Sequence, residues 1–262
     1  MNLDLSGKKA IVCGSTDGIG KASAIELAQL GASVILVARN EDKLVRTRKE
    51  LDTSKGQEHH YIVADFDFAP ELKMRVEDYI SETGPVQILV NNTGGPAGGP
   101  IINAKTEEFL HTFNAHLICN HILVQAVVPG MKESGYGRII NIISTSVKQP
   151  LPGLGVSNTI RAAVANWSKT LAGELGAYNI TVNNVLPGAT MTQRLQSIAE
   201  KKSAASGKSV EEILAHMAAE VPMARVGQAH EIAAAVAFLA SPAASYINGI
   251  NVPVDGGRTG CL

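Results

Sequence analysis

The chain has 262 residues, of which 45% are hydrophobic and 18% charged, and this composition is typical of a globular protein rather than a disordered one. Its 23 Lys and Arg residues balance 24 Asp and Glu residues, which argues against a nucleic-acid-binding surface. Without a secretion signal at its start or an apolar run near the roughly 18 residues of a membrane span, we expect a cytoplasmic protein with no membrane partner.

Short apolar strands alternate with longer helical segments from the start of the chain. A buried strand at 10–13 leads through a glycine-rich turn into a helix with apolar residues at 19, 22, 25, 27, 28 and 30. Further strands are predicted at 33–38, 60–65, 87–92, 138–144, 180–187 and 250–255, and further helices at 41–51, 70–80, 106–131, 155–176 and 231–239.

This alternation predicts parallel strands with helices on both faces, and strands that are apolar throughout agree with burial on both sides. We therefore predict an α/β fold, a single doubly wound, Rossmann-like sheet of about seven strands. One domain over residues 1–262 is expected, because such folds often exceed 200 residues without splitting.

Residues 191–225 interrupt this rhythm with a long helical stretch of mixed polarity. An Ala-Ser-Gly break at 205–207 predicts two helices with a joint between them. Because the stretch follows the sixth strand, we expect it to lie over the carboxyl ends of the strands as a substrate lid. A surface segment with no role in substrate binding would have the same sequence pattern.

The turn after the first strand has glycines at 14, 18 and 20. A strand that leads into a helix through such a turn directs backbone amides at one point, at the positive end of the helix dipole. Glycine allows both the turn and a close approach by a phosphate. The turn therefore predicts a dinucleotide site, with a purely structural turn as the alternative.

This turn, spaced G-x-x-x-G-x-G, resembles the cofactor turn of the short-chain dehydrogenase/reductase family, and four later segments extend the resemblance. These are Asp65, the NNTG sequence at 91–94, Pro187-Gly188 with Thr190 and Thr192, and the ending at 245–257. Within that family, the chain resembles 3-oxoacyl-ACP reductase-like proteins. The resemblance implies an NAD(P)-dependent oxidoreductase. It would transfer hydride between the nicotinamide and a small carbonyl or alcohol substrate, commonly as a homotetramer.

The resemblance also implies which residues bind the cofactor. They are Gly14, Ser15, Thr16, Gly18, Ile19 and Gly20 in the turn, Arg39, Asp65 and Phe66 near the adenine, Asn91, Thr93 and Gly94 in the cleft, Arg161 at the ribose, and Pro187, Gly188, Thr190 and Thr192 near the nicotinamide.

The choice of cofactor depends on the end of the second strand. An acidic residue that accepts both ribose hydroxyls is expected there, but the sequence has Ala38 followed by Arg39. Arginine can bind a 2′-phosphate, which favours NADP(H), unless Arg39 is only a solvated cation. Asp17 argues for NAD(H), because many NADP-using relatives have a basic residue there. NADP(H) is favoured and NAD(H) remains possible.

The catalytic positions depart from the family, whose members use an Asn-Ser-Tyr-Lys tetrad. The strand at 138–144 places the family serine at Ser144, and the match of 161–175 to the family helix places the lysine at Arg161 and the tyrosine at Ser157. The asparagine position is His116. Of the tetrad, only the serine is present.

These replacements change the chemistry, because a serine hydroxyl is shorter and far less acidic than that of tyrosine, and arginine is a fixed cation. We hypothesise that Ser144 polarises a carbonyl while His116, titrating near neutrality, or Lys148 supplies the proton. The alternatives are a structural histidine and a surface lysine. The competing function is a non-catalytic cofactor sensor or structural subunit.

Cys13, Cys119 and Cys261 lack metal-ligand spacing, so we expect no metal site. The first two lie in apolar elements and are predicted to be reduced and structural, while the third lies in the tail and is expected to be exposed.

Overall fold

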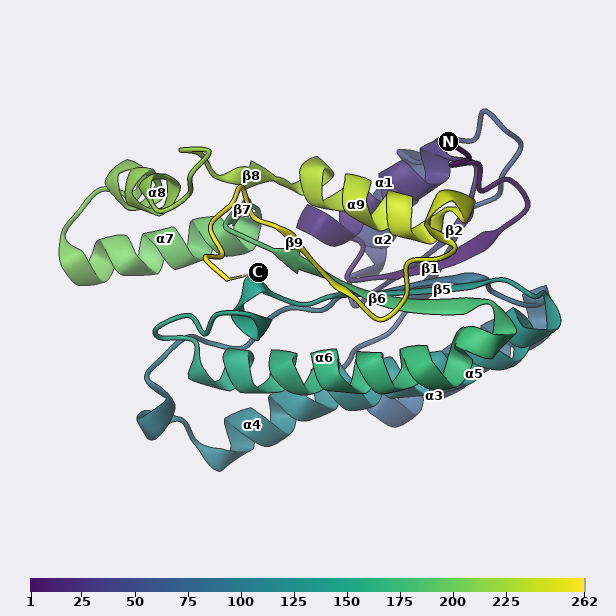
Figure 1. Cartoon of the computed structure of the whole chain (residues 1–262), viewed down its shortest axis with the longest axis horizontal. Helices are drawn as coiled ribbons and strands as arrows, with labels where there is room; N and C mark the ends of the chain where they lie inside the picture. The colour runs from purple at the N-terminus through teal and green to yellow at the C-terminus, as the bar shows by residue number, and fades with distance from the viewer. Residues whose placement is uncertain (262) are drawn as a thin grey trace.

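The computed structural model describes residues 1–261, which form a seven-stranded parallel sheet with helices on both faces (Figure 1). The strand order is β3-β2-β1-β4-β5-β6-β9. Its strands are β1 Lys9–Cys13, β2 Ser33–Ala38, β3 His60–Val63, β4 Ile88–Asn91, β5 Gly137–Ile142, β6 Ile180–Pro187 and β9 Asn251–Val254. The order reverses between β1 and β4, where open α/β sheets bind ligands at the carboxyl ends of their strands. The predicted Rossmann-like fold is confirmed.

Two apolar layers hold the helices to the sheet. One face is covered by α1 Gly18–Gln29, α2 Glu41–Lys49 and α9 Ala229–Ala240, and the other by α3 Ala69–Thr83, α5 Cys119–Glu133 and α6 Gly155–Leu175. Alternate strand residues enter opposite layers: Ile11 packs in the α3 layer and Val12 in the α1 layer. The apolar strands are therefore explained by burial on both sides.

The predicted helix at 106–131 contains a break in its regular turn. The segment folds as α4 Thr106–Phe113, a π-helical turn over Asn114–Ile118, and then α5. A π turn carries an extra residue and is frequently found at functional sites. It contains His116, which is buried. Boundaries of the other predicted elements differ from the structure by no more than three residues.

The stretch after β6 forms two helices, as predicted. Thr192 caps the start of α7 Gln193–Ser206, which ends at Gly207 in a left-handed conformation with φ of 73°. Ser209 then caps α8 Val210–Ala219. The short strands β7 Thr190–Met191 and β8 Gly227–Gln228 pair in parallel and join the two ends of this α7–α8 segment. Figure 1 shows it beyond the strand ends.

A row of asparagine side chains crosses four neighbouring strands. Asn91 Nδ2 donates to Asn141 Oδ1 at 2.8 Å, Asn141 Nδ2 to Asn184 Oδ1 at 3.0 Å, and Asn184 Nδ2 to Asn251 Oδ1 at 2.8 Å. These residues are paired in the sheet register of β4, β5, β6 and β9. Because buried amides are costly to leave unbonded, this asparagine row fixes the four strands relative to one another.

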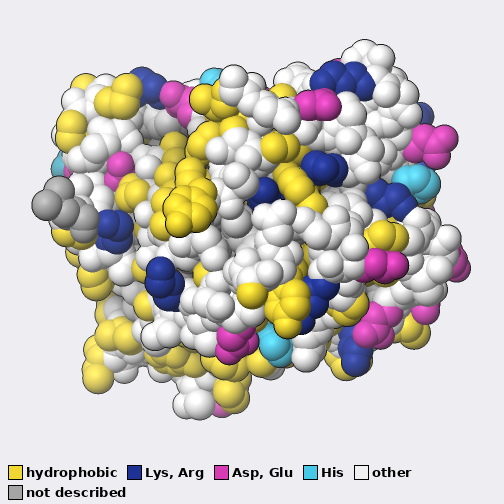
Figure 2. Space-filling view, turned by 45° about the vertical axis from the view of Figure 1, so that its right-hand side comes forward, with side chains coloured by type: hydrophobic (Ala, Val, Ile, Leu, Met, Phe, Trp, Pro, Cys, Tyr) yellow, Lys and Arg dark blue, Asp and Glu magenta, His cyan; other side chains and the backbone are white. Residues whose placement is uncertain are grey.

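On the face shown in Figure 2, Lys and Arg side chains are dispersed among acidic and apolar ones. None of the helices in residues 1–261 has both the length and the apolar character needed to cross a membrane. Cys13 and Cys119 are buried and free, and Cys261 is exposed, as predicted.

Candidate active site

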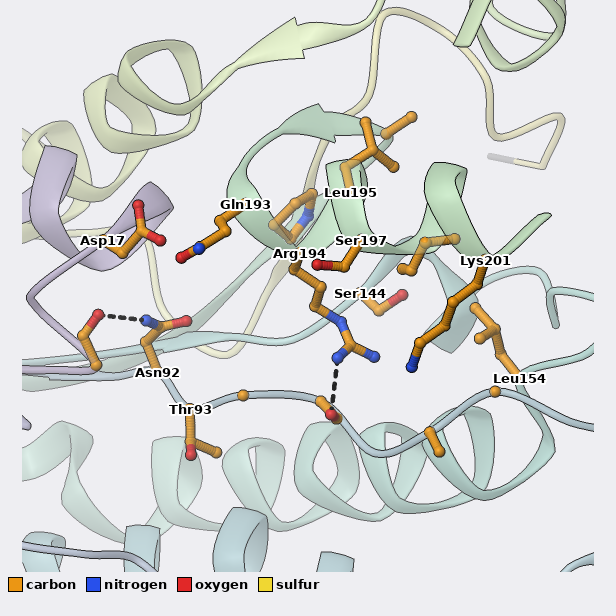
Figure 3. Close-up of a pocket in the computed structure, with 18 of the residues that line it drawn as sticks. Asp17, Asn92, Thr93, Ser144, Leu154, Gln193, Arg194, Leu195, Ser197 and Lys201 are labelled. Carbon is orange, nitrogen blue, oxygen red and sulfur yellow. Dashed lines mark hydrogen bonds between the residues drawn. The ribbon is translucent and has the colours of Figure 1, made fainter. Parts of the chain in front are cut away.

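A cavity of about 1390 Å³ follows the carboxyl ends of the strands and continues beneath the α7–α8 segment. One end is lined by Arg39 and Asp65 after β2 and β3, and the other by Leu154 and Lys201. Ser144 lines the part that Figure 3 shows. Since sites for drug-sized ligands usually occupy roughly 300–1,000 Å³, this cavity has room for a dinucleotide and a second small molecule.

The glycine turn at one wall of the cavity is held by close backbone contacts. Gly14 and Gly18 have φ of 57° and 50°, where other residues are strained. A Cβ added at Gly20 would overlap the carbonyl oxygen of Gly14, and one at Gly14 would lie 2.7 Å from Asn92 Nδ2. The Asp17 side chain caps α1 by accepting from the Gly18 amide at 2.7 Å. This turn therefore has no space for larger side chains.

The predicted cofactor residues divide into those that line the cavity and those that support its wall. The lining set is Gly14, Thr16, Arg39, Asp65, Phe66, Thr93, Gly94, Pro187 and Gly188. Among the supporting residues, Ser15 and Asn91 are buried, Gly18, Ile19 and Gly20 begin α1, and Thr190 and Thr192 lie at the base of the α7–α8 segment.

The end of the cavity after β2 carries two basic side chains, Arg39 and Lys43. The Arg39 guanidinium is 72% exposed and lies 3.7 Å from an Asp65 carboxylate oxygen. An exposed pair at this distance contributes little to stability, so the guanidinium is available to a stronger anion.

The five predicted catalytic residues are not brought together. Ser144 lines the large cavity (Figure 3). Its Oγ accepts a hydrogen bond from the Ser146 amide at 3.1 Å, which leaves the hydroxyl proton free to be donated. His116 and Arg161 instead line a smaller hollow next to β4. Neither Ser157 nor Lys148 lines either space.

His116 is a hydrogen-bonding residue of the wall. Its Nε2 lies 3.0 Å from the Gly94 carbonyl oxygen, so Nε2 is the protonated nitrogen. Burial, and after it the positive charge of Arg161, lowers the pKa of His116 to about 2. The expectation that it titrates near neutrality is therefore wrong, because the imidazole stays neutral in the fold.

Arg161 is tied to the end of β5, where its Nη1 donates to the Ile142 carbonyl oxygen at 2.7 Å. Burial, together with the nearby charge of Arg194, lowers the pKa of Arg161 to about 10. The guanidinium therefore remains a cation at neutral pH.

The pKa of His116 has a measurable consequence for stability. In the unfolded chain a histidine titrates near 6.5, so only the unfolded state binds this proton as the pH falls below 6.5. Between pH 7.5 and 5.5 we expect the free energy of unfolding to fall by about 1.4 kcal/mol more in the wild type than in His116→Asn. Urea unfolding at both pH values measures this difference, and equal losses in the two proteins would contradict it.

Among the residues of the cavity wall that sequence reasoning missed, three bear on the site. Asn92 Nδ2 donates to the Cys13 carbonyl oxygen at 3.2 Å and so joins the end of β4 to the end of β1, where the glycine turn begins. Arg194 and Lys201 project from α7 into the cavity (Figure 3). The place of Asn92 in the NNTG sequence could have identified it. Arg194 and Lys201 have no such signal, because in the sequence alone they look like solvent-facing residues of a helix.

Comparison with known proteins agrees with this geometry. Residues 14–259 match the family model described as Enoyl-(Acyl carrier protein) reductase. The chain belongs to the short-chain dehydrogenase/reductase family. As a member of that family, it is an oxidoreductase.

Relatives and solved structures within the short-chain dehydrogenase/reductase family match nearly the whole chain. The "NADPH-dependent reductase BacG" of Bacillus subtilis is 33% identical over 261 residues, covering 97% of this chain and 98% of the relative. The "3-oxoacyl-[acyl-carrier-protein] reductase FabG" of Pseudomonas aeruginosa is 34% identical over 260 residues, with 97% and 98% covered. The structure of L-sorbose reductase from Gluconobacter frateurii with NADPH and L-sorbose is 33% identical, with a TM-score of 0.94 and both chains fully covered.

Proposed function

We propose that this protein is an NADP(H)-dependent reductase that transfers hydride between the nicotinamide and a carbonyl or alcohol group of a small molecule. The observation that carries the proposal is the single cavity that joins the glycine turn to Ser144. The names of similar proteins support the cofactor, since BacG is called an NADPH-dependent reductase and the structure of an actinorhodin polyketide ketoreductase, 34% identical with a TM-score of 0.90, contains NADPH.

The residues present fit a dinucleotide. An added Cβ at Gly94 would meet nothing within 4 Å, so this lining position is open to a ligand. The amides of the glycine turn would hold the diphosphate, and Arg39 and Lys43 would bind the 2′-phosphate. NADP(H) is therefore favoured, and NAD(H) remains possible. When bound, the cofactor supplies the hydride chemistry.

We expect Arg39→Ala to weaken NADPH binding about ten- to a hundredfold and to leave NADH binding within about twofold, because only the 2′-phosphate loses a charge-assisted hydrogen bond. Fluorescence titration with each cofactor measures both effects. Lys49→Ala, at the exposed end of α2, is the control. An equal loss for NADPH and NADH would contradict the assignment.

The catalytic set that we propose is non-standard, with Ser157 and Arg161 at the tyrosine and lysine positions. Ser144 would donate a hydrogen bond to the substrate oxygen, and the fixed charge of Arg161, behind the cavity wall, would stabilise negative charge that develops there. His116 is held neutral and hydrogen-bonded to Gly94, and Lys148 does not line the cavity. We therefore propose that a water molecule in the cleft, rather than either side chain, supplies the proton that converts the substrate oxygen into the alcohol hydroxyl.

The reaction is tested by adding NADPH to the purified protein and screening ketones for its oxidation at 340 nm. We expect tight NADPH binding and turnover of at least one carbonyl compound. Binding without turnover on any of them would favour the sensor or structural role. No binding of either cofactor would overturn both.

We also propose that the α7–α8 segment serves as a substrate lid on a single domain, because it supplies much of the lining beyond Ser144. A homotetramer is the expected assembly. Exposed apolar residues that would suit such contacts include Ile102, Leu110 and Tyr246. Analytical ultracentrifugation measures the assembly, and a monomer at micromolar concentration would contradict it.

A further inference from the structure

The inner face of α7 places Arg194 and Lys201 in the cavity, and Lys202 of the same helix also lines it. Arg194, Ile198, Lys201 and Ala205 follow one another at helical spacing and all line it. Figure 3 shows the Arg194 and Lys201 side chains reaching from α7 into the space that Ser144 also lines. This face is therefore built for contact with a ligand next to the proposed reaction site.

Neither cation has an acidic partner. Among residues 1–261, no carboxylate lies within 4.0 Å of the nitrogen atoms of Arg194 or Lys201. Glu220, which also lines the cavity, is paired with Arg258 at 2.5 Å. Arg161 adds a further positive charge behind the wall and is close enough to Arg194 for the pKa of Arg161 to fall. This end of the cavity thus has an excess of positive charge that an anion would neutralise.

The Arg194 guanidinium is held in place before any ligand arrives. Its Nη1 donates to the Gly95 carbonyl oxygen at 2.9 Å and its Nη2 to the Pro96 carbonyl oxygen at 2.7 Å. A Cβ added at Gly95 would lie 3.1 Å from Nη2, so glycine lets the guanidinium lie against this loop. Three of the five donors of Arg194 remain for a ligand. An arginine fixed in this way loses little freedom on binding a carboxylate.

The Lys201 ammonium makes no hydrogen bond or ion pair to any other residue of 1–261, so it is available to the cavity. Leu154 and Leu195 add apolar surface to the same region (Figure 3). The cations at the opposite end, Arg39 and Lys43, are assigned to the cofactor phosphate, which leaves the α7 cations without a role in cofactor binding.

We propose that the substrate is an oxo acid, whose carboxylate binds Arg194 and Lys201 while its carbonyl group lies at Ser144. This inference rests on the proposed function and specifies its substrate class. A carboxylate suits the site because it accepts two parallel hydrogen bonds from a guanidinium and pairs with an ammonium.

The test compares oxo acids of increasing length, from 2-oxobutyrate to 5-oxohexanoate, with their methyl esters. At saturating NADPH we expect kcat/KM for the best acid to exceed that for its ester about ten- to a hundredfold. Lys201→Gln should lower the value for the acid about tenfold, chiefly through KM, and leave the value for the ester within about twofold. Arg194→Gln should act in the same way, and Arg194→Lys should recover part of the loss.

Lys208→Gln is the matched control, because this lysine lies between α7 and α8, is exposed and does not line the cavity. It should leave both substrates unaffected. NADPH affinity, measured by fluorescence, should be unchanged in all these variants. Equal kcat/KM for acid and ester, or an equal loss of both in Lys201→Gln, would overturn the inference while leaving the proposed function standing.

If the protein binds NADPH but reduces none of these compounds, calorimetry with glutarate and glutaramide on the NADP⁺-saturated protein decides the question. Binding of glutarate alone, weakened by Lys201→Gln, would support the inference, and any other result would overturn it. Failure to bind NADPH would overturn the proposed function and this inference with it.

Discussion

Replacing Ser144 with alanine is expected to lower kcat for carbonyl reduction about a hundred- to a thousandfold, the usual cost of removing a hydrogen-bond donor from a developing oxyanion. The hydroxyl lines the cavity and has its proton free, because its oxygen already accepts from the Ser146 amide. NADPH affinity should change less than about twofold, since Ser144 is not among the residues assigned to the cofactor. Initial rates at saturating NADPH and substrate, together with a fluorescence titration, measure both quantities.

Ser146→Ala provides the control for this experiment. Ser146 is buried two residues further along the chain, and its Oγ has no hydrogen-bond partner among residues 1–261. The substitution removes the Ser146 hydroxyl without breaking a hydrogen bond. The Ser146 amide, which donates to Ser144 Oγ, stays in place. A Ser144→Ala enzyme as fast as Ser146→Ala would show that Ser144 does not polarise the substrate.

Replacing Gly20 with alanine is expected to weaken NADPH binding by about a hundredfold or more. The added methyl group would overlap the carbonyl oxygen of Gly14 and approach Asn92 Nδ2 at 2.8 Å, so the turn must move. Displaced amides lose their hydrogen bonds to the charged diphosphate, each worth about 1.5–3 kcal/mol, and two such losses account for the change. The dissociation constant is measured from the fluorescence of bound NADPH.

Gly173→Ala is the matched substitution, because Gly173 lies within α6 and an added Cβ there meets nothing within 4 Å. It should keep wild-type affinity and leave stability unchanged or raised by up to about 1 kcal/mol. Circular dichroism of both variants separates a moved turn from an unfolded chain. A folded Gly20→Ala protein with wild-type affinity would contradict the placement of the diphosphate at this turn.

Most of the fold could be predicted because its signals are local. Apolar strands such as 33–38 and the glycines at 14, 18 and 20 carry their structural requirements in short stretches of sequence. The π turn at Asn114–Ile118 could not be predicted, because apolar residues continue through it and one extra residue shifts the phase of the helical pattern without interrupting it.

The site was harder to predict because its properties arise between elements. The low pKa of His116 comes from burial and from Arg161, which lies on a different helix. Arg194 and Lys201 belong to a stretch of mixed polarity, where cations usually face solvent. Only the position of α7 over the strand ends directs them inward.

The asparagine row bears on which parts of the cleft can move. Because Asn91, Asn141, Asn184 and Asn251 are hydrogen-bonded one to the next across β4, β5, β6 and β9, we expect this part of the cleft floor to stay rigid. We therefore expect the movement that admits a dinucleotide to come from the α7–α8 segment, which is attached through the short β7 and β8 strands. Arg194, hydrogen-bonded to the loop at Gly95 and Pro96, would have to release both bonds for that movement to occur.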